Sequence, residues 1–227
     1  MGQLSFFAGV DMGDPATFYP ADRWNPYGYY EQWDVITLNK SLLHGPYGKL
    51  SYFLLPSTRT IMKRACGYAE QIRDVAHKYQ QQVIKCPRFS LTLPAWTAHG
   101  ADIERMIICL REPIQVAQSI RKRNRDLTWH GLYLWYTHNK RLLEHIGDIP
   151  VWYVRYSHLI DRETSLQELG HAFRFLGRDL GDAELKALVA ERVKPELRNH
   201  AQVIQAYPRP IQRLWEDLCA RHAAQFE

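Results

Sequence analysis

The sequence predicts an α/β domain in which a central parallel sheet carries helices on both faces. Three short runs of almost continuous apolar character, residues 82–86, 105–110 and 151–155, have the size of strands buried on both faces. The segments between them repeat apolar residues every three or four positions, as helices do. Strands that alternate with helices form parallel sheets, because each return to the same edge needs a crossover. The sequence contains no repeats, low-complexity tracts or Gly/Ser linkers, so residues 1–227 are predicted to form a single domain.

The first third of the chain is predicted to contain a loop and two helices. Residues 14–30 are rich in Pro, Gly, Tyr and Trp and are expected to form an irregular, well-packed loop. A helical pattern runs from about residue 29 to residue 43, with apolar residues on one face. A longer pattern runs from about residue 58 to residue 79, and Ser57 or Thr58 can cap its start.

Prolines mark the boundaries of the later elements. Pro87 ends the first predicted strand, and Pro150 directly precedes the third. Pro113 and Pro210 suit the first position of a helix, where the missing N–H would have no intrahelical partner. We therefore expect helices that begin near residues 113 and 210, together with helices over residues 132–146 and 166–176.

The charge balance favours an anionic ligand. The sequence has 29 Lys and Arg against 24 Asp and Glu, which suits a nucleotide, phosphate or sulfate, although a slightly basic solvated surface explains the same numbers. No apolar run approaches the roughly 20 residues that span a bilayer, and the N-terminus lacks a signal-peptide pattern. We therefore expect a cytoplasmic protein without a membrane span and without a nucleic-acid partner.

Metal and disulfide chemistry are not expected. The four cysteines are scattered, with no pair close enough for a zinc knuckle. The ten histidines show no spacing typical of a metal site or a hydrolase triad, so each is expected to be an ordinary surface or core residue.

Polar residues follow two of the predicted strands, at the sheet edge where ligands of parallel sheets bind. Lys85 and Arg88 flank the end of the first strand, and Arg111 follows the second. Ser119 and Arg123 lie four residues apart on the next predicted helix, so they share a face. Together these groups could hold a phosphate dianion. The alternative is a capped surface helix with solvated arginines and a lysine that only extends into water.

These residues resemble a known family. Lys85-Cys86-Pro87-Arg88, followed by the segment 107–113 with Ser119 eight residues after Arg111, resembles the core of the sulfotransferases that use 3′-phosphoadenosine-5′-phosphosulfate. Further similar segments are residues 25–31, 135–139, 154–159, 173–177 and 193–198. The resemblance covers roughly residues 9–200 and is closer to bacterial and Golgi-type (tyrosylprotein) members than to cytosolic ones, because Pro87 and Arg88 stand where cytosolic members have a histidine.

The resemblance implies a three-layer fold similar to P-loop NTPases and a donor site at the strand ends. It implies that Arg111 and Ser119 bind the 3′-phosphate of the donor, with help from Arg123. The implied cofactor is 3′-phosphoadenosine-5′-phosphosulfate, the product is adenosine 3′,5′-bisphosphate, and no metal is implied. The implied acceptor is a hydroxyl group of a carbohydrate, lipid, phenol or peptide.

The catalytic roles are implied in the same way. Lys85 matches the lysine beside the transferring sulfuryl group, and Arg88 adds positive charge there. Glu31 falls where several members place the carboxylate that takes the acceptor's proton. Two other interpretations of Glu31 remain open: a carboxylate near a helix N-terminus, and the ion-pair partner of a nearby arginine.

The sequence departs from the family at its start. Family members begin with a strand and a Gly-rich loop that binds the 5′-phosphosulfate, whereas residues 1–10 resemble the later part of the helix after that loop. We expect little activity from residues 1–227 alone. Three hypotheses follow: a start further upstream, donor binding through the 3′-phosphate only, or a non-catalytic nucleotide-binding or scaffolding homologue.

The strand missing from the start has a second consequence, and the sequence also bears on a third class of function. The edges of the neighbouring strands would be exposed, which leaves homo-oligomer formation open. A nucleoside or sugar kinase is disfavoured, because the sequence has neither a phosphate loop nor an acidic magnesium site.

Overall fold

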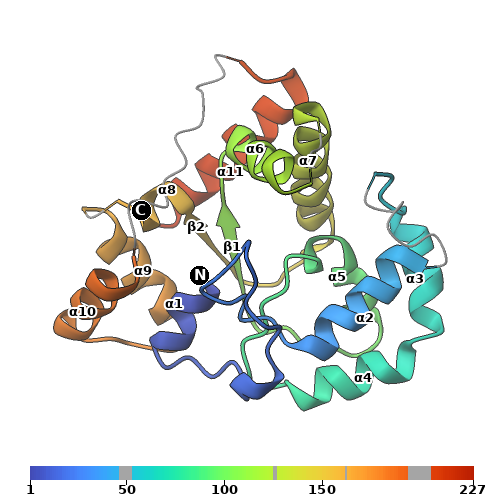
Figure 1. Ribbon diagram of the computed structural model, residues 1–227, viewed down its shortest axis with the longest axis horizontal. Helices are drawn as coiled ribbons and strands as arrows, with labels where there is room; N and C mark the ends of the chain where they lie inside the picture. Colours follow the sequence, from blue (N-terminus) through green and yellow to red (C-terminus); the bar gives the residue numbers. More distant parts are fainter. Residues whose placement is uncertain (46–52, 125–126, 162, 194–205) are drawn as a thin grey trace.

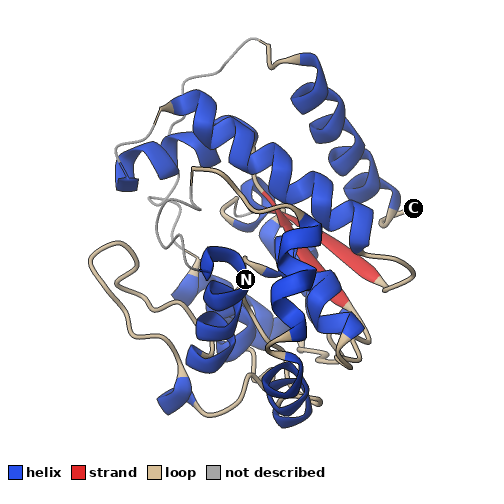
Figure 2. Ribbon diagram, turned by 90° about the vertical axis from the view of Figure 1, so that its right-hand side faces the viewer, coloured by secondary structure: helices blue, strands red, loops and turns tan. Residues whose placement is uncertain are grey.

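The computed structural model describes residues 1–45, 53–124, 127–161, 163–193 and 206–227 (Figure 1). These residues form a mixed α/β structure that is mostly helical, with a parallel sheet of two strands (Figure 2). β1 (Met106–Leu110) pairs with β2 (Val151–Arg155) from one end to the other, and Leu110 lies opposite Arg155. Both strands were predicted from the sequence, and both are confirmed.

The predicted strand at residues 82–86 is wrong, and the central sheet is correspondingly smaller than expected. Residues 83–86 have no regular secondary structure. The Val83 N–H donates to the carbonyl of Asp11 at 2.8 Å, and Ile84 and Cys86 pack into a helical cluster away from the sheet. Apolar character alone therefore does not make this segment a strand, because its side chains are buried by helices instead.

Helices cover both faces of the two-stranded sheet. Ile108, Leu110 and Tyr153 pack against helices α7 and α11, whereas Val154 packs against α1, α9 and α10. This division follows from the alternation of side chains along a strand. The helices concerned are α1 (Gly2–Phe7), α7 (Thr128–His145), α9 (Ser165–Phe175), α10 (Asp182–Arg192) and α11 (Arg209–Ala224).

A separate helical cluster lies beside the sheet. It consists of α2 (Trp33–His44), α3 (Thr58–Cys66), α4 (Ala69–Lys78) and α5 (Phe89–Ala98). The helix predicted over residues 58–79 is divided at Gly67, where α3 ends. The helix predicted from residue 29 begins later, because Tyr30 has a φ of 54°, in the left-handed region that a helix does not use. Between these helices and the N-terminus, residues 14–30 form a loop with one short 3₁₀ helix (Pro15–Thr17).

A buried hydrogen-bond network joins α2 to α5. Asn39 is fully buried, and its Oδ1 accepts from Thr92 Oγ1 at 2.6 Å and from Trp96 Nε1 at 2.9 Å. Asn39 Nδ2 contacts Cys86 Sγ at 3.4 Å. Because buried polar groups are costly unless they are paired, this network fixes Cys86, and with it the flanking cations Lys85 and Arg88, against α2.

Two further helices follow the strands directly. α6 (Pro113–Asn124) starts after β1, and its proline is the first helical residue, as predicted. α8 (Tyr156–Leu159) continues from β2. No helix among the described residues is long and apolar enough to cross a membrane.

Candidate functional site

Glu31, Lys85 and Arg88 form one cluster of charges. Lys85 Nζ lies 2.5 Å from Glu31 Oε1, and Arg88 Nη1 lies 3.4 Å from Glu31 Oε2. Glu31 is only 4% exposed, so its carboxylate is held by cations and not by water. Lys85, with 37% of its side chain exposed, is the most accessible member, and the Arg88 side chain is 21% exposed. The structure therefore confirms that Glu31 is the ion-pair partner of a nearby arginine, and it adds Lys85 as a second partner.

The N-terminal helix lies against this cluster. A Cβ atom at Gly2 would lie 3.3 Å from Tyr30 Cβ and 3.5 Å from Lys85 Cγ. The start of α1 therefore packs on the aliphatic part of the Lys85 side chain and leaves its ammonium group beside Glu31.

Arg111 occupies the carboxyl end of β1. Its guanidinium carbon lies 4.4 Å from the centre of the Tyr156 ring, and its Nε donates to Gln115 Oε1 at 3.3 Å. The stacking follows from the strand register, since residues 111 and 156 come directly after the paired Leu110 and Arg155. The main chain is fixed as well, because Trp135 Nε1 donates to the Arg111 carbonyl at 3.0 Å.

Among the described residues, Arg111 has no carboxylate within salt-bridge distance. The neighbouring Glu112 is engaged elsewhere: it accepts from Gln115 Nε2 at 3.2 Å and from the Tyr207 hydroxyl at 3.1 Å. Burial lowers the pKa of Arg111, as expected for a cation removed from water. A half-buried guanidinium stacked on a tyrosine is able, in chemical terms, to bind an anion that reaches the end of the strand.

Ser119 and Arg123 lie on the same helix, and both are exposed. The charge of Arg123 acts on Asp22 and Tyr29, which places its side chain near the loop at residues 22–29. Burial and the hydrogen bond to Asp22 raise the pKa of Tyr29 to about 12. Within the described part of the chain, no hydrogen bond or ion pair joins Lys85, Ser119 or Arg123 to Arg111. Of the predicted residues, Glu31, Lys85 and Arg88 are thus brought together, whereas Arg111, Ser119 and Arg123 are not joined to one another by a hydrogen bond or ion pair among the described residues.

A histidine missed by the sequence analysis lies beside the first group. His138 Nδ1 is 2.6 Å from Ser90 Oγ, and the Ser90 hydroxyl donates to the Pro87 carbonyl at 2.7 Å. Burial, together with the charges of Arg141 and Arg88, lowers the pKa of His138 to about 4. The ring is therefore neutral at physiological pH.

This histidine makes stability depend on pH. The unfolded chain takes up the proton near pH 6.5 and the folded protein only near pH 4, so the contribution of the neutral ring is complete above pH 6.5 and is lost as the pH falls towards 4. The difference corresponds to at most about 3 kcal/mol, and we expect about 1–2 kcal/mol because the ring is partly exposed. Urea denaturation at pH 7.5, 6, 5 and 4 measures the free energy of unfolding. Between pH 7.5 and 4, it should fall by this amount more in wild type than in His138→Gln. The same dependence of the unfolding free energy on pH in both proteins would contradict the low pKa of His138.

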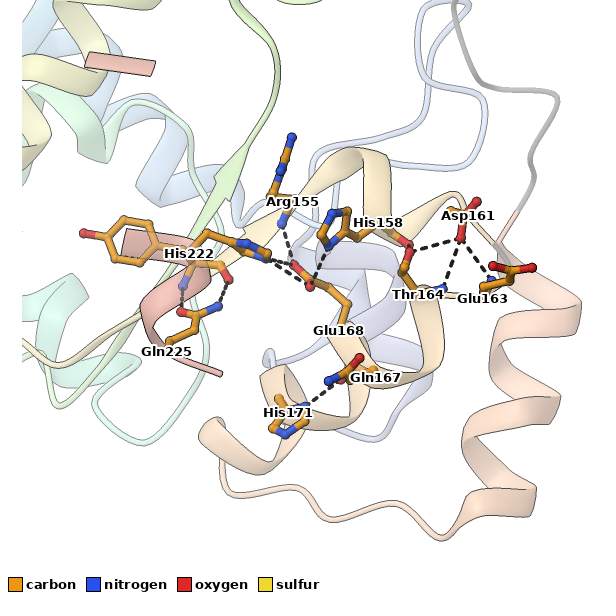
Figure 3. A network of polar contacts seen from close by, with 11 residues as sticks. Arg155, His158, Asp161, Glu163, Thr164, Gln167, Glu168, His171, His222 and Gln225 are labelled. Carbon is orange, nitrogen blue, oxygen red and sulfur yellow. Dashed lines mark hydrogen bonds and ion pairs between the residues drawn. The ribbon is translucent and has the colours of Figure 1, made fainter. Parts of the chain in front are cut away.

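A third polar cluster joins three helices near the end of β2 (Figure 3). Glu168 on α9 accepts from the Arg155 backbone N–H at 2.6 Å. His222 Nε2 on α11 lies 2.9 Å from Glu168 Oε1, and His158 Nδ1 on α8 lies 3.3 Å from Oε2. Burial raises the pKa of Glu168, but the hydrogen bonds from His222 and Arg155 outweigh it, and the pKa lies below its ordinary value. The separations in sequence, 10 and 54 residues, match no known motif, so the sequence held no signal for this cluster.

Comparisons of the chain with protein-family models, with curated proteins and with solved structures find no match.

Proposed function

We propose that the protein is a sulfotransferase, which transfers the sulfuryl group of 3′-phosphoadenosine-5′-phosphosulfate to a hydroxyl group. The observation that carries the proposal is Arg111: a half-buried cation, at the carboxyl end of a parallel strand, without a carboxylate partner among the described residues. The helices on both faces of the sheet are compatible with the proposed three-layer, P-loop-like arrangement, in which ligands bind at this edge.

In the proposed reaction, Arg111 and Ser119 bind the 3′-phosphate of the donor. The guanidinium supplies charge-assisted hydrogen bonds from a fixed plane, and Ser119, on α6, adds a hydroxyl. Arg123 contributes positive charge at the end of the same helix. This arrangement selects a nucleotide with a 3′-phosphate over ATP, which has none.

The transfer step is proposed to use the cluster around Glu31. The acceptor oxygen forms a bond to sulfur while the bond from sulfur to the bridging oxygen of the 5′-phosphate breaks. Lys85 and Arg88 offset the charge that develops on the departing adenosine 3′,5′-bisphosphate. Glu31 accepts the proton of the acceptor hydroxyl. The ion pair between Lys85 and Glu31 has to open for both roles, and the exposed ammonium group of Lys85 is free to move towards a ligand.

The same ion pair favours a second candidate function. With Lys85 held at 2.5 Å from Glu31, neither group is directed at a substrate. A protein that binds the nucleotide without turnover, as a sensor or scaffold, would need only the Arg111 group.

Two measurements separate these functions. Calorimetric titration of the purified chain with adenosine 3′,5′-bisphosphate, with ATP as the control, tests the nucleotide site. Transfer of ³⁵S-labelled sulfuryl groups from the donor to carbohydrate, phenol, lipid and peptide acceptors tests catalysis. We expect selective bisphosphate binding and, from residues 1–227 alone, weak but measurable transfer to one acceptor class. Selective binding without transfer supports the second function, and equal or no binding of the two nucleotides contradicts both.

A further inference from the structure

The cluster of Glu168, His158 and His222 takes no part in the proposed reaction, yet its chemistry is that of a metal site. Two imidazoles and one carboxylate are a ligand set that proteins use for Zn²⁺. The three ligand atoms lie within 4.8 Å of one another. Figure 3 shows both imidazoles directed at the same carboxylate, from helices on either side of it.

The distances fit tetrahedral coordination. Glu168 Oε2 lies 3.1 Å from His222 Nε2 and 3.3 Å from His158 Nδ1. Ligands at about 2.0–2.1 Å from a tetrahedral zinc ion are roughly 3.3 Å apart. An ion can therefore be placed between these three atoms with small side-chain movements. To bind it, each imidazole presents a lone pair at the nitrogen that faces Glu168 and carries its proton on the other ring nitrogen.

The second oxygen of the carboxylate is already fixed. Glu168 Oε1 accepts the Arg155 N–H at 2.6 Å, which orients the carboxylate. Outer hydrogen bonds of this kind are typical of metal ligands. His222 Nε2 lies close to both oxygens, at 2.9 Å from Oε1 and 3.1 Å from Oε2, and His158 contacts Oε2. The end of α11 is also held, because the side chain of Gln225 bonds to both the N–H and the carbonyl of Tyr153, at 2.9 and 2.6 Å.

The burial of the Glu168 carboxylate is a further argument for a bound cation. Glu168 is 2% exposed, and its hydrogen-bond partners in the described part of the chain are one backbone N–H and two imidazoles, without a lysine or arginine. A divalent ion would offset the buried negative charge. The side chain of His158 is 32% exposed, so one side of the cluster is open to solvent and gives the ion an entry path and a water ligand.

We propose that His158, Glu168 and His222 bind a zinc ion that ties the C-terminal helix α11 to α8 and α9. The three ligands come from separate elements, so the site exists only in the folded chain. Zinc binding therefore stabilises the folded state by mass action.

The test uses the tag-free, metal-stripped chain with Zn²⁺ and Co²⁺ as probes. Wild type is expected to bind one ion per chain and to give the visible absorption of four-coordinate Co²⁺, which Zn²⁺ displaces. Zinc at a hundred times its dissociation constant should raise the thermal midpoint by about 5–10 °C in a chain of this size. His158→Ala removes the accessible ligand and is expected to lower zinc affinity at least tenfold and to abolish the cobalt absorption.

Two further variants make the test decisive. His77→Ala removes an exposed histidine on α4, outside the cluster, and is expected to bind zinc like wild type. Glu168→Gln keeps an acceptor for the Arg155 N–H but removes the charge, so it should fold and bind zinc weakly. Absence of the cobalt absorption and of the zinc-dependent midpoint shift in wild type would overturn the proposal and leave the cluster as a hydrogen-bonded clamp. Equal zinc affinity in wild type and His158→Ala would overturn it too.

Discussion

Arg111→Ala is expected to weaken binding of adenosine 3′,5′-bisphosphate by about ten- to a hundredfold. A hydrogen bond to a charged group contributes roughly 1.5–3 kcal/mol, which corresponds to that change in the dissociation constant. The folded structure should survive, because the contacts of the Arg111 side chain with the described residues are a stacking contact with Tyr156 and one hydrogen bond to Gln115. Calorimetric titration of wild type and variant at one fixed salt concentration measures the effect.

The matched control is Arg121→Ala. Arg121 is an exposed arginine in the last turn of α6 and has the same charge. It tests whether the general positive field, and not the position at the end of β1, attracts the nucleotide. We expect its affinity to stay within about twofold of wild type, because exposed charges are screened. Similar losses in both variants would remove Arg111 from the proposed site.

Gly131→Ala is expected to lower the free energy of unfolding by about 2–3 kcal/mol, although alanine normally stabilises a helix interior by about 1 kcal/mol over glycine. A Cβ at this position would lie 2.6 Å from Ala117 Cα and 2.8 Å from Ala117 Cβ, so α6 and α7 would have to separate. The main chain of α6 cannot yield as a flexible side chain can. Urea denaturation of the two proteins measures the loss.

The same variant tests how the helix pair supports the nucleotide site. α6 starts two residues after Arg111 and carries Ser119, so a displaced α6 should also weaken bisphosphate binding. Gly170→Ala on α9 is the control: its new Cβ would lie 3.3 Å from Leu185 Cδ2 and 3.9 Å from Arg174 Nη2, two side-chain ends that a rotation can move away. We expect its stability to stay within about 1 kcal/mol of wild type. A loss in Gly170→Ala as large as in Gly131→Ala would show that general sensitivity to helix substitutions, and not the α6–α7 contact, causes the effect.

The strands show how far apolar patterning predicts structure. Residues 106–110 and 151–155 were predicted and form β1 and β2. Residues 82–86 have a similar composition but form no strand, because α2 and α5 bury Cys86 through the Asn39 network. A short apolar run predicts that its side chains are buried. It does not predict whether the run itself forms a strand.

The helix boundaries show the same limit. The pattern over residues 58–79 predicted one helix, and the chain forms two, divided at Gly67. The apolar period continues across the break, since both helices face the same cluster. Periodicity therefore indicates which side of the chain is buried. The position of the break at Gly67 depends instead on how α4 packs against the neighbouring helices.

For the candidate site, the sequence alone determined which strand ends carry cations, because a residue that directly follows a strand lies at the sheet edge whatever the rest of the fold does. It thereby placed Arg111 correctly at the end of β1. The pair Lys85 and Arg88 was assigned to the end of a strand that the chain does not form, and helices position it instead. Only the tertiary structure decided which charged groups meet. Glu31 forms ion pairs with Lys85 and Arg88, which are more than 50 residues away in the sequence. Glu168 contacts two histidines that come from separate helices. Such contacts depend on how whole helices and strands pack together, so the spacing of residues in the sequence does not predict them.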